Sequence, residues 1–118
     1  MDGRIFDLLC KEKLPVDFVS THPYPTDYAF DVETGRGRGA ARYVNSTSDD
    51  LKWLKKTITN SKYPNAEIHL TEWSSSPSSR DNIHDALPAA TFIIKANLDC
   101  IGLANSLMYW TFTDIFEE

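Results

Sequence analysis

The sequence of 118 residues lacks the long apolar run, about 18 residues or more, that a helix needs in order to cross a membrane. It is also short of basic charge. Twelve Lys and Arg stand against seventeen Asp and Glu, which gives a formal net charge of −5. Proteins that bind nucleic acid through its phosphates usually carry a basic surface. We therefore expect neither a membrane nor a nucleic acid as partner.

Cysteine is scarce as well. Cys10 and Cys100 form no Cys-x-x-Cys pair and show none of the His and Cys spacings that are typical of metal sites. We expect two free thiols, no metal and no cofactor. Two thiols do not fix a redox compartment, so the sequence leaves localisation open, together with the oligomeric state.

What the sequence does contain is the composition of a globular protein. Hydrophobic residues make up 42% and charged residues 25% of the chain, which argues against disorder. Residues 1–13 resemble the end of an amphipathic helix, and the chain stops at Phe116-Glu117-Glu118 with no closing element after a strand. We therefore expect one piece, residues 1–118, truncated at both ends.

Helices and strands are predicted to alternate after the opening helix. The expected elements are a strand at 16–21, a loop at 22–47, a helix at 49–60, a strand at 67–73, a loop at 74–84, a helix at 86–100 and a strand at 105–112. Ser48 and Asp85 are the expected N-caps of the two helices, and Gly102 is the expected C-cap. This alternation predicts βαβ units and a parallel sheet.

Two parallel architectures compete. A doubly wound sheet usually shows a phosphate-binding turn, but the GRGRG segment at 35–39 does not match GxGxxG and opens no helix. In a (β/α)8 barrel, the chemistry lies at the carboxyl ends of the strands. The three predicted strands end with His22, Glu72 and Trp110, which favours one shared mouth. We therefore expect the α/β class and a (β/α)8 barrel. A complete barrel needs on the order of 250 residues, so this chain is expected to form only part of one.

Three segments together carry a family resemblance. LTEWSSSPSSRDNIHD is followed after one helix by SLMYWTFTDIFEE, and FVSTHPYP lies upstream. In this order they resemble glycoside hydrolase family 39, which contains β-xylosidases and α-L-iduronidases, retaining enzymes on a (β/α)8 barrel. The resemblance runs from about residue 14 to residue 118 and implies strands six to eight of the barrel.

The resemblance implies that Glu72 is the catalytic nucleophile. The residue type suits the role, because a retaining glycosidase attacks the anomeric carbon with one carboxylate while a second carboxyl group, about 5–5.5 Å away, protonates the leaving oxygen. Strand alternation puts Ile68, Leu70 and Glu72 on one face, and predicts that His69 packs toward the helices. Trp73 and the serines after it are expected to shape the rim of the site.

The resemblance also implies a set of sugar-binding residues. His22 and Tyr24 would contact the sugar and hold the nucleophile, and Trp110 would form an apolar platform beneath the sugar. The Trp110-Thr111 bond is expected to be a cis peptide, as in related barrels. Glu117 and Glu118 would accept hydrogen bonds from sugar hydroxyls, a task that suits carboxylates.

One part of the family pattern is missing. The general acid/base of the family is a Glu in an Asn-Glu-Pro segment, and Asn-Glu does not occur in this sequence. We therefore expect a parent protein that removes terminal xylose from xylo-oligosaccharides by double displacement, and a fragment that is inactive alone. Three alternatives stay open: an α-L-iduronidase-like enzyme, whose uronate would pair with Arg36, Arg38 or Arg42, a sugar-binding barrel without catalysis, and a small structural domain.

Overall fold

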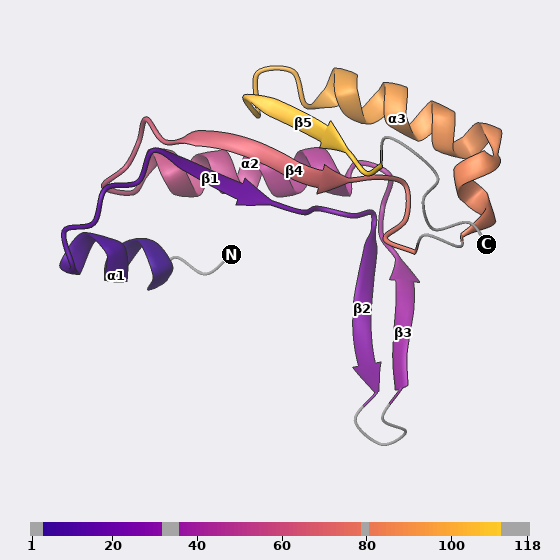
Figure 1. Ribbon diagram of the computed structural model, residues 1–118, viewed down its shortest axis with the longest axis horizontal. Helices are drawn as coiled ribbons and strands as arrows, with labels where there is room; N and C mark the ends of the chain where they lie inside the picture. Colours follow the sequence, from indigo (N-terminus) through magenta and orange to yellow (C-terminus); the bar gives the residue numbers. More distant parts are fainter. Residues whose placement is uncertain (1–3, 32–35, 79–80, 112–118) are drawn as a thin grey trace.

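The computed structural model describes residues 4–31, 36–78 and 81–111 (Figure 1). The elements in chain order are α1 (Arg4–Lys11), β1 (Phe18–Thr21), β2 (Thr26–Asp31), β3 (Arg36–Ala41), α2 (Ser46–Thr59), β4 (Glu67–Trp73), a 3₁₀ helix (Asn82–Asp85), α3 (Leu87–Asp99) and β5 (Ser106–Tyr109). The predicted alternation of helices and strands is confirmed. Strands β2 and β3 and the 3₁₀ helix were not predicted.

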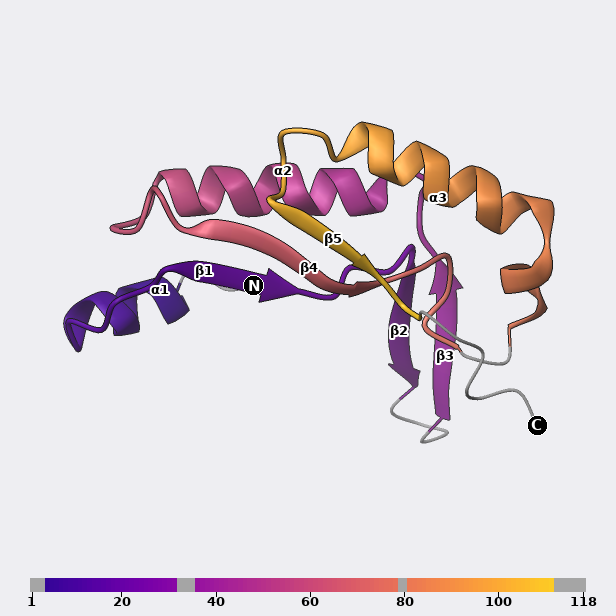
Figure 2. The same cartoon turned by 45° about the horizontal axis from the view of Figure 1, so that its top comes forward.

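Strands β1, β4 and β5 form one parallel sheet in the order β1-β4-β5. Val19 of β1 pairs with Ile68 of β4, and Leu70 of β4 pairs with Leu107 of β5. Helices α2 and α3 lie on the same face of this sheet (Figure 2). The structure is therefore a small α/β piece made of βαβ units, as expected, and all three strands end at the same edge.

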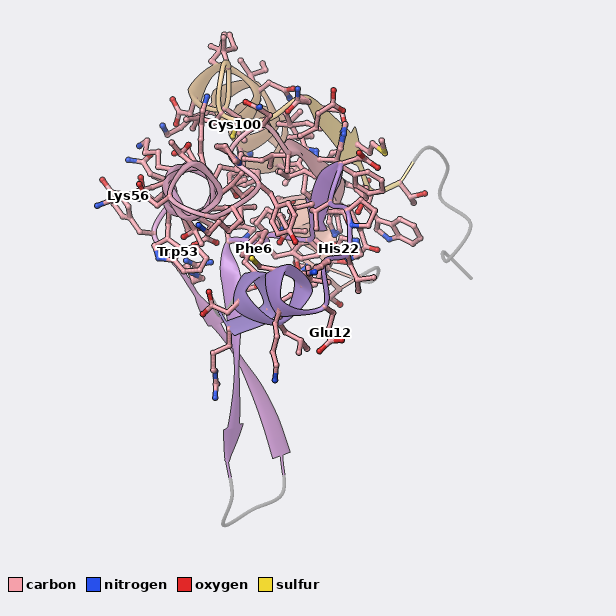
Figure 3. The ribbon with its side chains drawn as sticks, turned by 90° about the vertical axis from the view of Figure 1, so that its left-hand side faces the viewer. Phe6, Glu12, His22, Trp53, Lys56 and Cys100 are labelled. Atoms are coloured by element: carbon pink, nitrogen blue, oxygen red, sulfur yellow. The ribbon has the colours of Figure 1, made fainter. Side chains whose placement is uncertain are left out.

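The core lies between the sheet and the two helices. Leu51 and Leu54 of α2 are almost completely buried against Leu70 of β4. Burial of one such side chain stabilises the fold by about 1.5–3 kcal/mol. Phe6 of α1 points into the body of the protein, where its ring lies 6.4 Å from that of Tyr63 (Figure 3). The apolar side chains of α1 and α2 thus meet in one core with the sheet.

The opposite face of the sheet is not covered by any helix within the described residues. Phe18 of β1 is 59% exposed there, and its ring meets the edge of His69 at 5.6 Å. The Nδ1 of His69 lies 2.7 Å from the Oγ of Ser106 on β5. The prediction that His69 packs toward the helices is wrong, because the neighbouring Ile68 and Leu70 occupy that side.

Strand β4 contains one extra residue. Leu70 pairs with Leu107 and Trp73 pairs with Tyr109, so three steps along β4 match two along β5. Such a bulge breaks the alternation of side chains. Trp73 consequently joins Ile68 and Leu70 in the core at 1% exposure, and the adjacent Glu72 points to the other side. The expectations that Glu72 shares a face with Ile68 and Leu70, and that Trp73 lies at the rim, are wrong.

The segment predicted as a loop at 22–47 contains a hairpin. Strands β2 and β3 are antiparallel, with Thr26 opposite Ala41 and Asp31 opposite Arg36. The backbone N–H of Arg42 donates to the carbonyl of Pro25 at 2.8 Å and closes the neck. The hairpin projects away from the sheet at the carboxyl end of β1 (Figures 1 and 2). It thus stands at the edge where the three strands end.

The predicted helix ends are shifted. The N-cap of α2 is Asn45, and the Oγ of Ser48 donates to the Asn45 carbonyl at 3.0 Å from within the helix. The N-cap of α3 is Ala86, because Asp85 belongs to the 3₁₀ helix. Helix α3 is capped at its other end by Cys100, and Gly102 lies two residues later with φ +73°, a left-handed conformation that glycine adopts readily.

Candidate active site

Glu72 lies near the end of β4 and is held by a tyrosine from the neighbouring connection. The Oη of Tyr24, three residues after β1, donates a hydrogen bond of 2.5 Å to the Oε1 of Glu72. Burial of Tyr24, together with this hydrogen bond, raises the pKa of its phenol well above the ordinary value near 10. Tyr24 therefore remains a neutral hydrogen-bond donor that orients the Glu72 carboxyl group.

His22 approaches the second oxygen of the same carboxylate. Its Nδ1 lies 3.7 Å from the Oε2 of Glu72, and its Nε2 lies 3.0 Å from the Oγ1 of Thr71. The imidazole ring therefore faces the Glu72 carboxylate with one nitrogen and the Thr71 hydroxyl with the other. The predicted trio of His22, Tyr24 and Glu72 is therefore brought together. Thr71 was missed, and its only sequence signal was its place beside Glu72.

Trp110 lies at the same edge, directly after β5. Its backbone N–H donates to the carbonyl of Trp73 at 2.9 Å, and its side chain is 40% exposed. The Trp110-Thr111 peptide bond is cis, as predicted. Tyr109 meets the ring of Trp73 edge-on at 5.6 Å, with Phe92 of α3 packed near the same indole at 6.2 Å. The strand end thus combines a buried Trp73 with a Trp110 that is partly exposed to solvent.

The serines that follow Trp73 are buried rather than part of an open rim. Ser74, Ser75 and Ser76 are at most 8% exposed. The Oγ of Ser74 donates to the carbonyl of Ser76 at 2.6 Å, and the Oγ of Ser75 lies 3.4 Å from the Nδ1 of His84. These hydrogen bonds fix the chain where it leaves β4. The three serines therefore stabilise the end of the strand.

The remaining predicted positions are only partly visible. Glu117 and Glu118 lie outside the described residues. Arg36 and Arg38 belong to β3, although the placement of their side chains is not described. The described residues include no group of three His, Cys, Asp or Glu side chains that could hold a metal ion. In the same part of the chain, no helix has the length and apolar character to span a membrane.

A cavity of about 410 Å³ lies behind the segment that carries His22 and Tyr24. Its walls come from the end of β1, the neck of the hairpin and helix α2, and they include Pro23, Asp50 and Trp53. Glu72 is not among the lining residues. His22 and Tyr24, which approach the carboxylate, therefore also line this cavity.

Comparisons with known proteins place this geometry in a class. The fold matches the crystal structure of a monomeric beta-xylosidase from Caulobacter crescentus CB15 with a TM-score of 0.82 and 31% identity, over 98% of this chain and 24% of that chain. The GH39 enzyme from Xanthomonas axonopodis pv. citri matches with a TM-score of 0.82 and 34% identity, over 98% and 23%. The piece thus has the fold of part of a TIM-barrel enzyme.

The sequence relatives agree. A beta-xylosidase from Caldicellulosiruptor saccharolyticus is 41% identical over 113 residues, which are 95% of this chain and 22% of that protein. A beta-xylosidase from Geobacillus stearothermophilus is 33% identical in an alignment of 123 positions, which covers 99% of this chain and 24% of that protein. The family model of the glycosyl hydrolases family 39 matches residues 4–118. The chain belongs to this family, and it spans less than a quarter of the length of these relatives.

Proposed function

We propose that these 118 residues are part of a longer retaining glycoside hydrolase that removes terminal xylose from xylo-oligosaccharides. Glu72 is its nucleophile. One observation carries this proposal: the Glu72 carboxylate, at the carboxyl edge of a parallel sheet, receives a 2.5 Å hydrogen bond from Tyr24 and lies 3.7 Å from His22. The family membership and the beta-xylosidase relatives support the same substrate class.

In the first step, an oxygen of Glu72 attacks the anomeric carbon while the bond to the leaving oxygen breaks. A nucleophilic carboxylate must be correctly aimed, and the Tyr24 and His22 contacts favour a fixed orientation. The product is a glycosyl ester of Glu72. In the second step, water gives a proton to the carboxyl group that acted as the acid, attacks the same carbon, releases the sugar with net retention and returns Glu72 to its carboxylate form.

The acid that protonates the leaving oxygen comes from elsewhere in the longer protein. His22 and Tyr24, the groups that face Glu72 in the described structure, are not carboxylic acids. A retaining mechanism requires a second carboxyl group about 5–5.5 Å away. If β1, β4 and β5 are strands six to eight of the barrel, this carboxyl belongs to an earlier strand, and the 118 residues alone are inactive.

The remaining residues bind the sugar in this proposal. Trp110, exposed at the end of β5, offers an apolar surface to the face of the sugar ring. His22 contacts a hydroxyl group, and Glu117 and Glu118 accept hydrogen bonds from others. The reaction needs no metal and no cofactor, because two carboxyl groups supply the nucleophile and the proton.

The test is Glu72→Gln in the full-length protein, with nitrophenyl β-xyloside as substrate. We expect kcat/KM to fall at least about a thousandfold, more than roughly 4 kcal/mol of barrier. Glu67→Gln is the control, because Glu67 lies on the same strand but pairs with His69 at 3.0 Å, and it should keep wild-type activity. Activity of Glu72→Gln within about tenfold of wild type would rule Glu72 out.

A second measurement separates a nucleophile from an acid. Azide added to Glu72→Ala should restore turnover and give a xylosyl azide of inverted configuration, since azide takes the place of the missing carboxylate. An azide product of retained configuration would identify Glu72 as the acid/base instead.

The structure bears on the α-L-iduronidase-like alternative at one point. Both terminal nitrogens of Arg42 are bonded to Asp50, at 2.6 and 2.8 Å. The guanidinium already has a carboxylate partner, which weakens the case that it receives a uronate. Turnover of a nitrophenyl iduronide rather than the xyloside by the full-length protein would overturn the proposed substrate.

A further inference from the structure

We propose that the ion pair between Arg42 and Asp50 is a positioning device for the reaction: it sets the place of Tyr24 over Glu72 from outside the site. This inference rests on the proposed function and adds two residues to it. The contacts that the described structure shows for Arg42 and Asp50 join them to each other and to Pro25, so both would act on Glu72 through the tyrosine.

The pair itself is a strong one. The Nη1 of Arg42 donates to the Oδ2 of Asp50 at 2.6 Å, and its Nη2 donates to the Oδ1 at 2.8 Å. Two parallel charge-assisted bonds fix the orientation of both groups as well as their distance. The side chains are 27% and 40% exposed, so solvent screens them less than a fully exposed pair.

Asp50 belongs to helix α2, which is the rigid partner in this ion pair. It lies in the first turns of α2, directly before Leu51, and Leu51 and Leu54 are buried against the strand that carries Glu72. The position of Asp50 relative to β4 is therefore fixed by the core.

Arg42 belongs to the other side. It is the first residue after β3, and its backbone N–H donates to the carbonyl of Pro25 at the neck of the hairpin. Pro25 follows Tyr24 directly in the chain. A shift of Arg42 thus moves the backbone next to the tyrosine.

The cavity shows which elements this link joins. It has a volume of about 410 Å³, and its lining includes Tyr24 from the segment after β1, Trp53 and Leu54 from α2, and Arg42 and Asp50 themselves. The two hydrogen bonds of the ion pair run from the neck of the hairpin to the helix, next to this cavity. Core, helix, ion pair, hairpin neck and tyrosine then form a closed path from β4 back to Glu72.

The experiment measures kcat and KM for nitrophenyl β-xyloside in the full-length protein, with Asp50→Asn and Arg42→Ala, each alone and combined with Tyr24→Phe. Asp49→Asn is the matched control. It removes the neighbouring acid of the same helix turn, whose pair with Lys52 is 55–59% exposed and does not reach the hairpin. Melting temperatures are recorded for every variant.

We expect Asp50→Asn and Arg42→Ala to lower kcat about tenfold at nearly unchanged KM, because a displacement of about 1 Å at a reacting group can cost up to a hundredfold. Asp49→Asn should stay within about twofold of wild type. In the Tyr24→Phe background, Asp50→Asn should cost less than about twofold more, because residues that act through one contact are not additive.

Two results would overturn the inference: activity of Asp50→Asn equal to that of Asp49→Asn, or a full additional loss in the Tyr24→Phe background. If Asp50→Asn does not fold, Arg42→Lys decides, since it keeps the charge and loses the two-bond geometry. Wild-type kcat in Arg42→Lys would then count against the positioning role. A loss of activity in Glu72→Gln, together with a full additional loss for Asp50→Asn in the Tyr24→Phe background, would reject the positioning role alone. The proposed function would then still stand.

Discussion

The Oη of Tyr24 and the Oε1 of Glu72 lie 2.5 Å apart, although 48 residues separate them in the chain. Strand β1 delivers the tyrosine and strand β4 delivers the carboxylate, and their parallel pairing brings both to one edge of the sheet. The contact therefore depends on the βαβ topology, and it offers several measurable consequences.

Tyr24→Phe removes the donor and leaves the ring. In the full-length protein we expect kcat/KM to fall by roughly ten- to a hundredfold, because the carboxylate loses both a stabilising hydrogen bond and a fixed orientation. Tyr63→Phe is the control, since its hydroxyl donates to the Leu14 carbonyl at 2.9 Å, before β1 begins. Steady-state kinetics with nitrophenyl β-xyloside would decide, and equal kcat/KM values for the two variants would contradict the assigned role.

Tyr24 also predicts a loss of stability in alkali. Burial and the hydrogen bond to Glu72 raise the pKa of Tyr24 in the folded protein, whereas the unfolded chain keeps a value near 10. The stabilising contribution is complete below pH about 10 and decreases above it, because only the unfolded state releases the proton there. Urea unfolding at pH 9 and pH 11 should show a larger loss for the wild type than for Tyr24→Phe. Parallel losses would show that the phenol ionises equally in both states.

Trp73 should dominate the stability of the strand end. It is 1% exposed between Phe92 and Tyr109, so Trp73→Ala leaves a cavity and should lower the free energy of unfolding by about 3–5 kcal/mol. Trp53→Ala is the matched comparison. Trp53 is 49% exposed on α2, and its removal should cost about 1 kcal/mol or less. Equal shifts in the urea midpoint would contradict the burial assigned to Trp73.

Cys100 should be protected from thiol reagents. Burial, together with the charge of Asp99, raises the pKa of its thiol, and the thiolate is the reactive form. In a Cys10→Ser variant, which removes the half-buried second thiol, Ellman's reagent should label Cys100 only after urea is added. Rapid labelling of that variant under native conditions would show that Cys100 is accessible.

The periodic parts of this fold were predictable from the sequence. β4 begins and ends where the apolar run predicts, at Glu67 and Trp73. Leu51, Leu54 and Ile58 recur at the spacing of one helix face, and all three are buried. The helix ends were less predictable. Ser48 satisfies the Asn45 carbonyl instead of capping, and either role suits a serine near a helix start.

Two features escaped prediction because the residues carry no signal for them. The strand at 36–41 is Arg-Gly-Arg-Gly-Ala-Ala, and glycine is depleted in strands, so only its pairing with β2 reveals the hairpin. The bulge before Trp73 could not be predicted either, because the sequence of β4 does not indicate whether one of its residues is left without a partner on β5. The trio around Glu72 was found from strand ends and family pattern, whereas Thr71 required the three-dimensional arrangement.

The extra residue in β4 also restricts how this site can be copied. A designer who transplants Glu67–Trp73 into another barrel transfers the chemistry only if the neighbouring strand accepts three residues opposite two. If the neighbouring strand pairs without a bulge, every residue of the transplanted strand beyond Leu70 faces the opposite side of the sheet. Either Trp73 then leaves the core, or Glu72 points toward the helices. A single-codon deletion between Leu70 and Trp73 would have the same effect in a natural lineage. The site therefore depends on the number of residues between Leu70 and Trp73 as well as on their types.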